Sequence, residues 1–255
     1  MEVIGISIVG VLIGIGVLLA IVESVAGIWN WVLIIRYHRF NGIAATNGLT
    51  GREVAEKLLA ESGVTDVAVK PCGFWRMLFG GNSYSYKKKT IFLRKNVIDV
   101  ASLTATAIAA NKAVFAIKDN EGDKKYKSRR VHFGIMSVFG AVAFIPLILI
   151  GILVDLALWA DFGAFSIVFA CIALFLVGYA IYGECVKIKI EELASAKALE
   201  LLINSGLIVD GEIEPIKKIY KTYIISDIIN LILAILMFIK IVLKVSLRLL
   251  TMKAK

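Results

Sequence analysis

The residues best able to do chemistry stand in the middle of an apolar segment. In TATAIAANKAVFAIKD (104–119), Ala and Ile recur at helical spacing without Gly or Pro, which predicts a helix. Asn111 and Lys112 interrupt this segment, and apolar residues flank them on both sides. An unpaired buried ammonium is costly. Lys112 therefore needs either a carboxylate partner or exposure to water, and residue types alone leave both readings open.

Histidine and cysteine offer little for metal chemistry. The chain has 2 His, at 38 and 132, and 3 Cys, at 72, 171 and 185. Each histidine adjoins an apolar run and lacks a third ligand, and the cysteines are odd in number without paired spacing. These patterns indicate neither a zinc site nor a disulfide framework. No P-loop, dinucleotide fingerprint or G-x-S-x-G motif is present.

The composition is that of a membrane protein. Hydrophobic residues make up 59% of the 255 residues and the mean hydropathy is +0.83, too apolar for an ordinary soluble domain. The formal net charge is +9, but the basic residues stand in blocks beside long apolar runs, and no nucleic-acid-binding motif accompanies them. This arrangement favours anionic lipid headgroups over nucleic acid as a partner.

The apolar runs divide the chain into five parts. The segment 36–132 carries 18 Lys and Arg against 8 Asp and Glu, so the positive-inside rule places it in the cytoplasm. We expect an N-terminal membrane anchor at 1–35, a basic cytosolic α+β domain at 36–132, two transmembrane helices within 133–186, a cytosolic helical segment at 187–222, and a C-terminal membrane-spanning or interfacial helix at 223–255.

Short elements are predicted within the basic domain. NGLTGREVAEKLLAESGV (47–64) has the pattern of one amphipathic helix, with Thr50 as N-cap and Glu53 as its capping-box partner. TDVAVK and KTIFLR alternate like short strands, and residues 97–118 supply a second helix.

Two groups of residues are candidates for contact with the membrane or a partner. CGFWRMLFGG (72–81) places an apolar finger between glycines, which either contacts the bilayer surface or a partner, or packs against the domain's own helices. Three basic residues in the last segment are four apart and share one helix face. The expected contact residues are Phe74, Trp75, Leu78, Phe79, Lys240, Lys244 and Arg248.

The order of these segments resembles a known family. GLTGREVAEKLL (48–59), KTIFL (89–93) and IEELASAKAL (190–199), with an anchor before them and two adjacent spans between, resemble the neutral zinc metallopeptidases of bacterial membranes. The similarity runs from about Asn47 to the last span. It implies a predominantly α protein of the bacterial cytoplasmic (inner) membrane, with three to four transmembrane helices and a small α+β cytosolic domain on a zincin-like scaffold.

In that family an H-E-x-G-H-A signature on the second helix carries the chemistry. Two histidines one turn apart bind zinc, and the glutamate between them activates a metal-bound water. Laid over this chain, Asn111 stands at the first histidine, Lys112 at the glutamate and Phe115 at the second histidine. Asn is a poor zinc ligand, Phe is none, and an ammonium repels a dication. The resemblance therefore implies a degenerate member without a metal cofactor.

Two further segments of the family pattern are altered. Glu191 matches the third ligand, while Leu193 replaces an aspartate, and Ser83-Tyr84-Ser85-Tyr86 aligns with a His-Tyr-Asp-Pro segment. We hypothesise that Lys112 pairs with the vestigial ligand Glu191, so that an ammonium stands in for the lost zinc.

The function expected from the resemblance and these substitutions is that of an inactive homologue. Such a pseudopeptidase would act as a structural or regulatory subunit of a membrane protein complex. Its expected partners are the anionic bilayer surface and other membrane proteins, with a catalytically intact homologue as one candidate. The alternative is a membrane-bound zinc-dependent peptidase with unconventional ligands.

Overall fold

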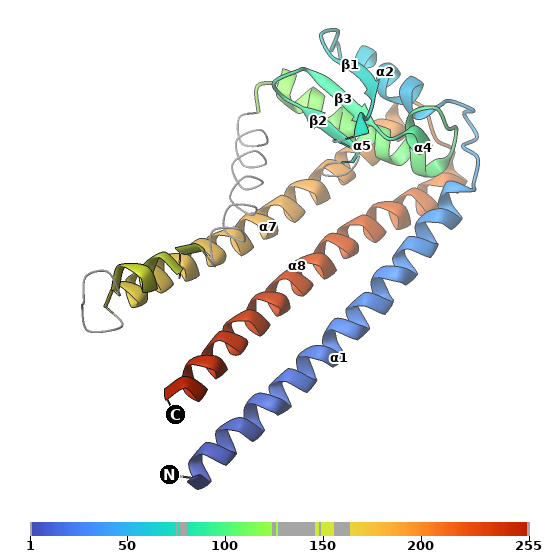
Figure 1. Cartoon of the computed structure of the whole chain (residues 1–255). Helices are drawn as coiled ribbons and strands as arrows, with labels where there is room; N and C mark the ends of the chain where they lie inside the picture. The colour runs from blue at the N-terminus through green and yellow to red at the C-terminus, as the bar shows by residue number, and fades with distance from the viewer. Residues whose placement is uncertain are drawn as a thin grey trace. The chain divides into compact units, whose positions relative to one another are not determined.

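The computed structural model describes residues 2–74, 76, 81–123, 126, 146–147, 149–155 and 164–253, with only the backbone described at 2–13, 15, 37, 237 and 240–253 (Figure 1). The described chain is mostly helical and carries one small sheet. It divides into two compact units, one made of Met1–His38 with Thr222–Lys255 and the other of Arg39–Lys221.

The described residues of the first unit are all helical. It contains most of α1 (Glu2–Asn41) and the C-terminal part of α8 (Asp210–Lys253). Large apolar side chains such as Val25, Ile28 and Trp31 are exposed along α1. A helix that exposes apolar side chains in this way is typical of a segment that lies in lipid.

Three helices in the described part of the chain are long and apolar enough to cross a membrane. The candidate spans are Gly16–Asn41, Phe165–Asn204 and Asp210–Leu236. The span expected within 133–154 lies mostly outside the described residues. A membrane location and a predominantly helical fold are therefore supported, whereas the zincin-like scaffold stays a prediction.

Helix α7 (Ala164–Asn204) differs from the prediction of a span followed by a separate helix. It is one continuous helix of 41 residues. Glu184 and Lys187 are the first charged residues of this helix, and from them on its surface carries charged side chains. They do not interrupt the helix, because Glu and Lys are both good helix formers. The hydropathy of the sequence therefore predicts where the apolar surface of the helix ends, and it does not predict where the helix itself ends.

The second unit contains a three-stranded sheet of order β1-β3-β2. β1 (Ala68–Pro71) lies parallel to β3 (Thr90–Leu93), and β2 (Ser83–Ser85) lies antiparallel to it. The register pairs Ile91 with both Val69 and Tyr84, and all three side chains are buried. The predicted strands correspond to β1 and β3, whereas β2 was not anticipated because three residues show no clear alternation.

Helix α5 (Leu103–Asn120) forms the centre of this unit. Fourteen of its 18 residues are buried, and it packs against α2 (Gly51–Glu61), α4 (Lys95–Ile98), α7 and the sheet (Figure 1). The Ser102 hydroxyl caps its N-terminus by accepting a bond from the Ala105 N–H at 3.1 Å. The predicted start at 97 was too early, because 97 and 98 belong to α4.

The capping box predicted for the first short helix is confirmed. Thr50 is the N-cap of α2, and the side chains and backbone N–H groups of Thr50 and Glu53 bond reciprocally. This local device sets the start of the helix that packs against α5.

Candidate functional site

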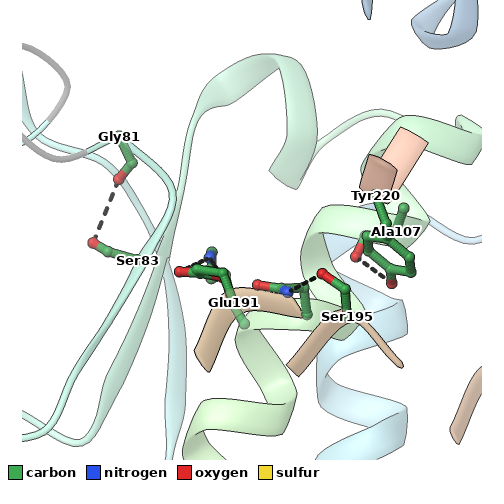
Figure 2. A network of polar contacts seen from close by, with 8 residues as sticks. Gly81, Ser83, Ala107, Glu191, Ser195 and Tyr220 are labelled. Atoms are coloured by element: carbon green, nitrogen blue, oxygen red, sulfur yellow. Dashed lines mark hydrogen bonds and ion pairs between the residues drawn. The ribbon is translucent and has the colours of Figure 1, made fainter. Parts of the chain in front are cut away.

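Five polar or aromatic side chains lie where α5 packs on α7, and we refer to them as the α5–α7 seam. Helix α5 contributes Asn111, Lys112 and Phe115. Helix α7 contributes Glu191 and Ser195, which Figure 2 labels. Asn111 and Phe115 are four residues apart, as are Glu191 and Ser195, so each pair shares one helix face. The three degenerate positions and the vestigial ligand therefore come together.

The charged pair of the seam joins α5 to α7. Lys112 Nζ donates to both carboxylate oxygens of Glu191 at 3.2 Å. The side chains are only 12% and 14% exposed, so solvent screens the pair weakly. The ammonium also lies 5.2 Å from the centre of the Phe115 ring, within the range of a cation–π interaction. The ion pair expected from the sequence is present in the structure.

A second polar contact lies beside the ion pair. Asn111 Nδ2 donates to the Ser195 hydroxyl oxygen at 3.1 Å, and both residues are buried (Figure 2). Asn111 Oδ1 is buried without a hydrogen-bond partner among the described residues. A buried acceptor left unpaired costs about 1 to 3 kcal/mol unless water reaches it. The amide is therefore held by one bond from the opposite helix.

Phe115 closes the seam with apolar surface. Its side chain is 1% exposed, and its ring meets Tyr126 edge to face at 5.7 Å between centroids. A benzene ring has no lone pair to offer a cation in the plane of the ring. The position of the second histidine in the family pattern is therefore taken by a buried phenylalanine, which packs against its neighbours.

These residues do not fit the zinc ion that the resemblance implies. A structural or catalytic zinc takes at least three nitrogen, sulfur or oxygen ligands from the protein. Here the one carboxylate, Glu191, is bound by an ammonium, and Asn111 and Phe115 provide no imidazole. Among the described residues, no group of three or more His, Cys, Asp and Glu side chains is arranged to hold a metal.

A second charged cluster, which sequence reasoning missed, lies at the C-terminal end of α5. Asp119 Oδ2 accepts bonds from the Tyr84 hydroxyl at 2.8 Å and from Lys89 Nζ at 2.9 Å. Burial, followed by the bond to Asp119, raises the pKa of Tyr84 above its usual value. The bond to Asp119 raises the pKa of Lys89. The segment Ser83 to Tyr86 therefore contacts a charged group, through the bond from Tyr84 to Asp119.

The residues expected to contact the membrane or a partner lie only partly within the described residues. Phe74 is 67% exposed, and Trp75, Leu78 and Phe79 lie outside the described residues. Leu193, at the altered family position on α7, is 54% exposed. Helix α8 includes Lys240, Lys244 and Arg248, and the structure describes only the backbone of these three residues. None of these residues joins the α5–α7 seam in the described structure.

Two long-range contacts of the second unit could not be anticipated from the sequence. The Tyr220 hydroxyl of α8 donates to the carbonyl oxygen of Ala107 at 2.9 Å (Figure 2). Glu212 accepts bonds at 2.8 Å from the backbone N–H and the hydroxyl of Thr46. Both contacts join residues more than a hundred positions apart in the chain, where no local pattern operates.

The chain is similar in sequence to one family of known proteins. The chain is 22% identical over 199 residues to the "Putative membrane protease YugP" of Bacillus subtilis (strain 168), a match that covers 76% of this chain and 82% of that protein. No solved structure matches the chain. The family model described as "Putative neutral zinc metallopeptidase" matches residues 14–246, so the chain belongs to that family.

Proposed function

We propose that this chain is a catalytically inactive member of its family, which acts by binding as a structural or regulatory subunit of a membrane protein complex. The observation that carries the proposal is the ion pair between Lys112 and Glu191. An ammonium stands where the family pattern has its general base, and it occupies the carboxylate that matches the third metal ligand.

The chemistry of the seam supports a binding role. A general base must accept a proton from water, and a lysine ammonium held against a carboxylate has only protons to donate. Its positive charge also opposes a dication at the same carboxylate. The substitutions at Asn111 and Phe115 remove both imidazoles, so with Lys112 three positions of the pattern lose the group that metal chemistry needs.

The family description favours a second candidate function. Relatives are described as a metallopeptidase family and as a membrane protease, which supports a membrane-bound zinc-dependent peptidase with unconventional ligands. This alternative requires ligands from outside the α5–α7 seam, because Glu191 is the only carboxylate there.

The proposed setting follows from charge and hydropathy. We place the second unit on the cytoplasmic side of a bacterial inner membrane, because the basic residues of 36–132 obey the positive-inside rule there. The proposed partners are the anionic bilayer surface and membrane proteins, and a catalytically intact homologue is one of them.

Metal analysis of the full chain, purified in mild detergent, separates the two functions. We expect no zinc, no hydrolysis of a mixed peptide library, and a membrane protein that stays bound through purification. About one zinc per chain, removed by a chelator together with peptidase activity, would overturn the proposal. The variant Glu191→Gln serves as the control, since it must abolish any zinc-dependent activity that uses this carboxylate.

A further inference from the structure

Three ends of strands meet at one edge of the small sheet. β1 and β3 are parallel and their register pairs Pro71 with Leu93, so both strands end at this edge. β2 runs antiparallel to β3 and therefore begins there, at Ser83. The Cys72 N–H donates to the Leu93 carbonyl oxygen at 2.7 Å, which extends the pairing of β1 and β3 by one residue. The register thus brings Cys72, Arg94 and the residues before Ser83 together.

The guanidinium group of Arg76 is held by two neighbours at this edge. Its Cζ lies 4.0 Å from the centre of the Phe92 ring, within the range of a cation–π interaction. Its Nη1 donates to the Ser83 hydroxyl oxygen at 3.1 Å. A guanidinium has five N–H donors, and the bond to Ser83 uses one of them. The sheet therefore orients the Arg76 side chain, which is only half-buried.

The guanidinium group of Arg94 lies against the backbone of Gly81. A Cβ atom added to Gly81 would stand 2.9 Å from Nη2 and 3.1 Å from Nε of Arg94, so a side chain here would displace the guanidinium. Gly81 also has a φ of +55°, which favours glycine. The Arg94 N–H donates to Asn82 Oδ1 at 2.7 Å, and Arg94 is exposed to solvent. Glycine at 81 therefore leaves room for an exposed cation beside the start of β2.

The Cys72 thiol lies within electrostatic reach of both arginines. Its Sγ donates to the Gly81 carbonyl oxygen at 3.1 Å, and the residue is half-buried. Burial raises the pKa of this thiol, and the positive charges of Arg76 and Arg94 oppose the rise. Two cations therefore lie near one small region of the surface. Because like charges near one point repel each other, a bound anion would relieve the repulsion.

We propose that Arg76, Arg94 and Ser83 form a binding site for a phosphate group of the monoester type, which carries up to two negative charges at neutral pH. The inference goes beyond the proposed function, because it involves neither the α5–α7 seam nor a protein partner. The planar guanidinium fork matches two oxygens of a phosphate, and two guanidinium groups balance its charge. The Ser83 hydroxyl meets the Gly81 carbonyl oxygen only at 3.5 Å, the outer limit of a hydrogen bond, so its proton can turn to a phosphate oxygen (Figure 2).

Two sources supply this chemistry, a lipid headgroup and a soluble phosphate ester. Phe74, two residues before Arg76, is 67% exposed, so the acyl chains of a lipid would find an apolar side chain beside the proposed site. A soluble ester would use the same two guanidinium groups. Phosphatidic acid in a bilayer is the probe for the first source, and inorganic phosphate and glycerol 3-phosphate in solution are the probes for the second.

The first experiment uses Cys72 as a reporter of charge. The full chain, with Cys171 and Cys185 replaced by Ser, is held in nanodiscs of phosphatidylcholine, and Cys72 is modified by an anionic or a cationic methanethiosulfonate of similar size. We expect the anionic reagent to react several-fold faster. Arg76→Gln and Arg94→Gln should each reduce this preference several-fold, whereas Lys217→Gln, which removes an exposed charge from α8, should leave it unchanged. An equal preference in all of these variants would overturn the proposal.

The second experiment tests for binding of phosphate. A neutral methanethiosulfonate measures the accessibility of Cys72 at pH 8 and constant ionic strength. Inorganic phosphate or glycerol 3-phosphate should slow the reaction several-fold if the source is a soluble ester. Phosphatidic acid in the nanodiscs should slow it instead if the source is a lipid. Phosphatidylglycerol, a diester with one negative charge, is the control lipid and should protect Cys72 far less.

Variants of the two arginines separate binding from an indirect effect. Arg94→Lys keeps the charge and loses the planar fork, so it should keep the preference for the anionic reagent and lose most of the protection by phosphate. Circular dichroism checks that each variant folds. Protection by neither source of phosphate overturns the proposal, and so does protection that survives in the double variant Arg76→Gln with Arg94→Gln. Equal protection by phosphatidic acid and phosphatidylglycerol overturns the assignment to a monoester.

Discussion

The ammonium nitrogen of Lys112 lies 3.2 Å from both carboxylate oxygens of Glu191, which stands 79 residues further along the chain. This pair connects the most buried helix of the second unit to a helix that continues into a candidate membrane span. Each charge stabilises the other in a nearly dry environment, because either charge alone would be poorly solvated there.

Removal of the ammonium should therefore destabilise the second unit. We expect Lys112→Met to lower the free energy of unfolding by about 3 kcal/mol, because it leaves the Glu191 charge largely buried and unpaired. Equilibrium unfolding in detergent micelles, followed by circular dichroism, measures the change. The double variant Lys112→Met with Glu191→Leu is the control and should recover most of the loss. An unchanged single variant would mean that water solvates the carboxylate.

Restoration of the family signature should create a metal site. The triple variant Asn111→His, Lys112→Glu and Phe115→His places two imidazoles one turn apart on α5, facing Glu191 on α7. We expect it to bind about one zinc per chain, measured by elemental analysis after gel filtration.

The matched control for the triple variant adds Glu191→Gln, which should abolish most of the zinc binding. Circular dichroism checks that both variants fold. A folded triple variant that binds no zinc would show that the spacing between α5 and α7 no longer suits a metal.

The cluster around Asp119 should make the second unit sensitive to alkali. The pKa of Tyr84 and the pKa of Lys89 are both raised in the folded state, so the fold holds these protons more tightly than the unfolded chain does. Their contribution is fully present below the unfolded pKa values of about 10 and is lost as pH rises further.

Unfolding measured from pH 7 to pH 11 tests this sign. The free energy of unfolding should stay level up to about pH 9 and fall above about pH 10. Tyr84→Phe should make the alkaline fall shallower, because it removes one of the two protons at issue. An equally steep fall in this variant would place the alkaline sensitivity elsewhere.

The N-cap of α2 should make a local contribution. Thr50→Ala removes the hydroxyl that accepts the Glu53 N–H, and we expect a loss of about 1 kcal/mol in the free energy of unfolding. Thr50→Ser keeps the hydroxyl and should stay close to the parent chain. Should both variants lose the same amount, packing of the threonine methyl group would explain the effect better than capping.

Local patterns predicted part of this fold correctly. The capping box at Thr50 and Glu53 is confirmed because it depends on residues three apart. Helix α5 and the strands β1 and β3 follow from short-range periodicity, with errors at their ends. The continuity of α7 was missed because hydropathy reports the surroundings of a helix, and a helical backbone passes from lipid to water without a break.

The sequence by itself determined what the α5–α7 seam is made of. It contains no imidazole at 111 or 115 and no carboxylate at 112, and residue identity alone sets which groups can donate, accept or bind a metal. The long apolar runs likewise indicated the membrane setting, since lipid accepts apolar side chains and charged ones are costly there.

The tertiary structure decided which groups meet beyond the pair of Lys112 and Glu191, which the family resemblance had suggested. It brought Asn111 to Ser195 and Tyr84 to Asp119, and neither contact was predicted. These contacts join residues between 35 and 84 positions apart, and they depend on how α5 is packed between α7 and the sheet. Packing of this kind is a property of the whole unit, because the face that each helix buries depends on all the side chains packed around it.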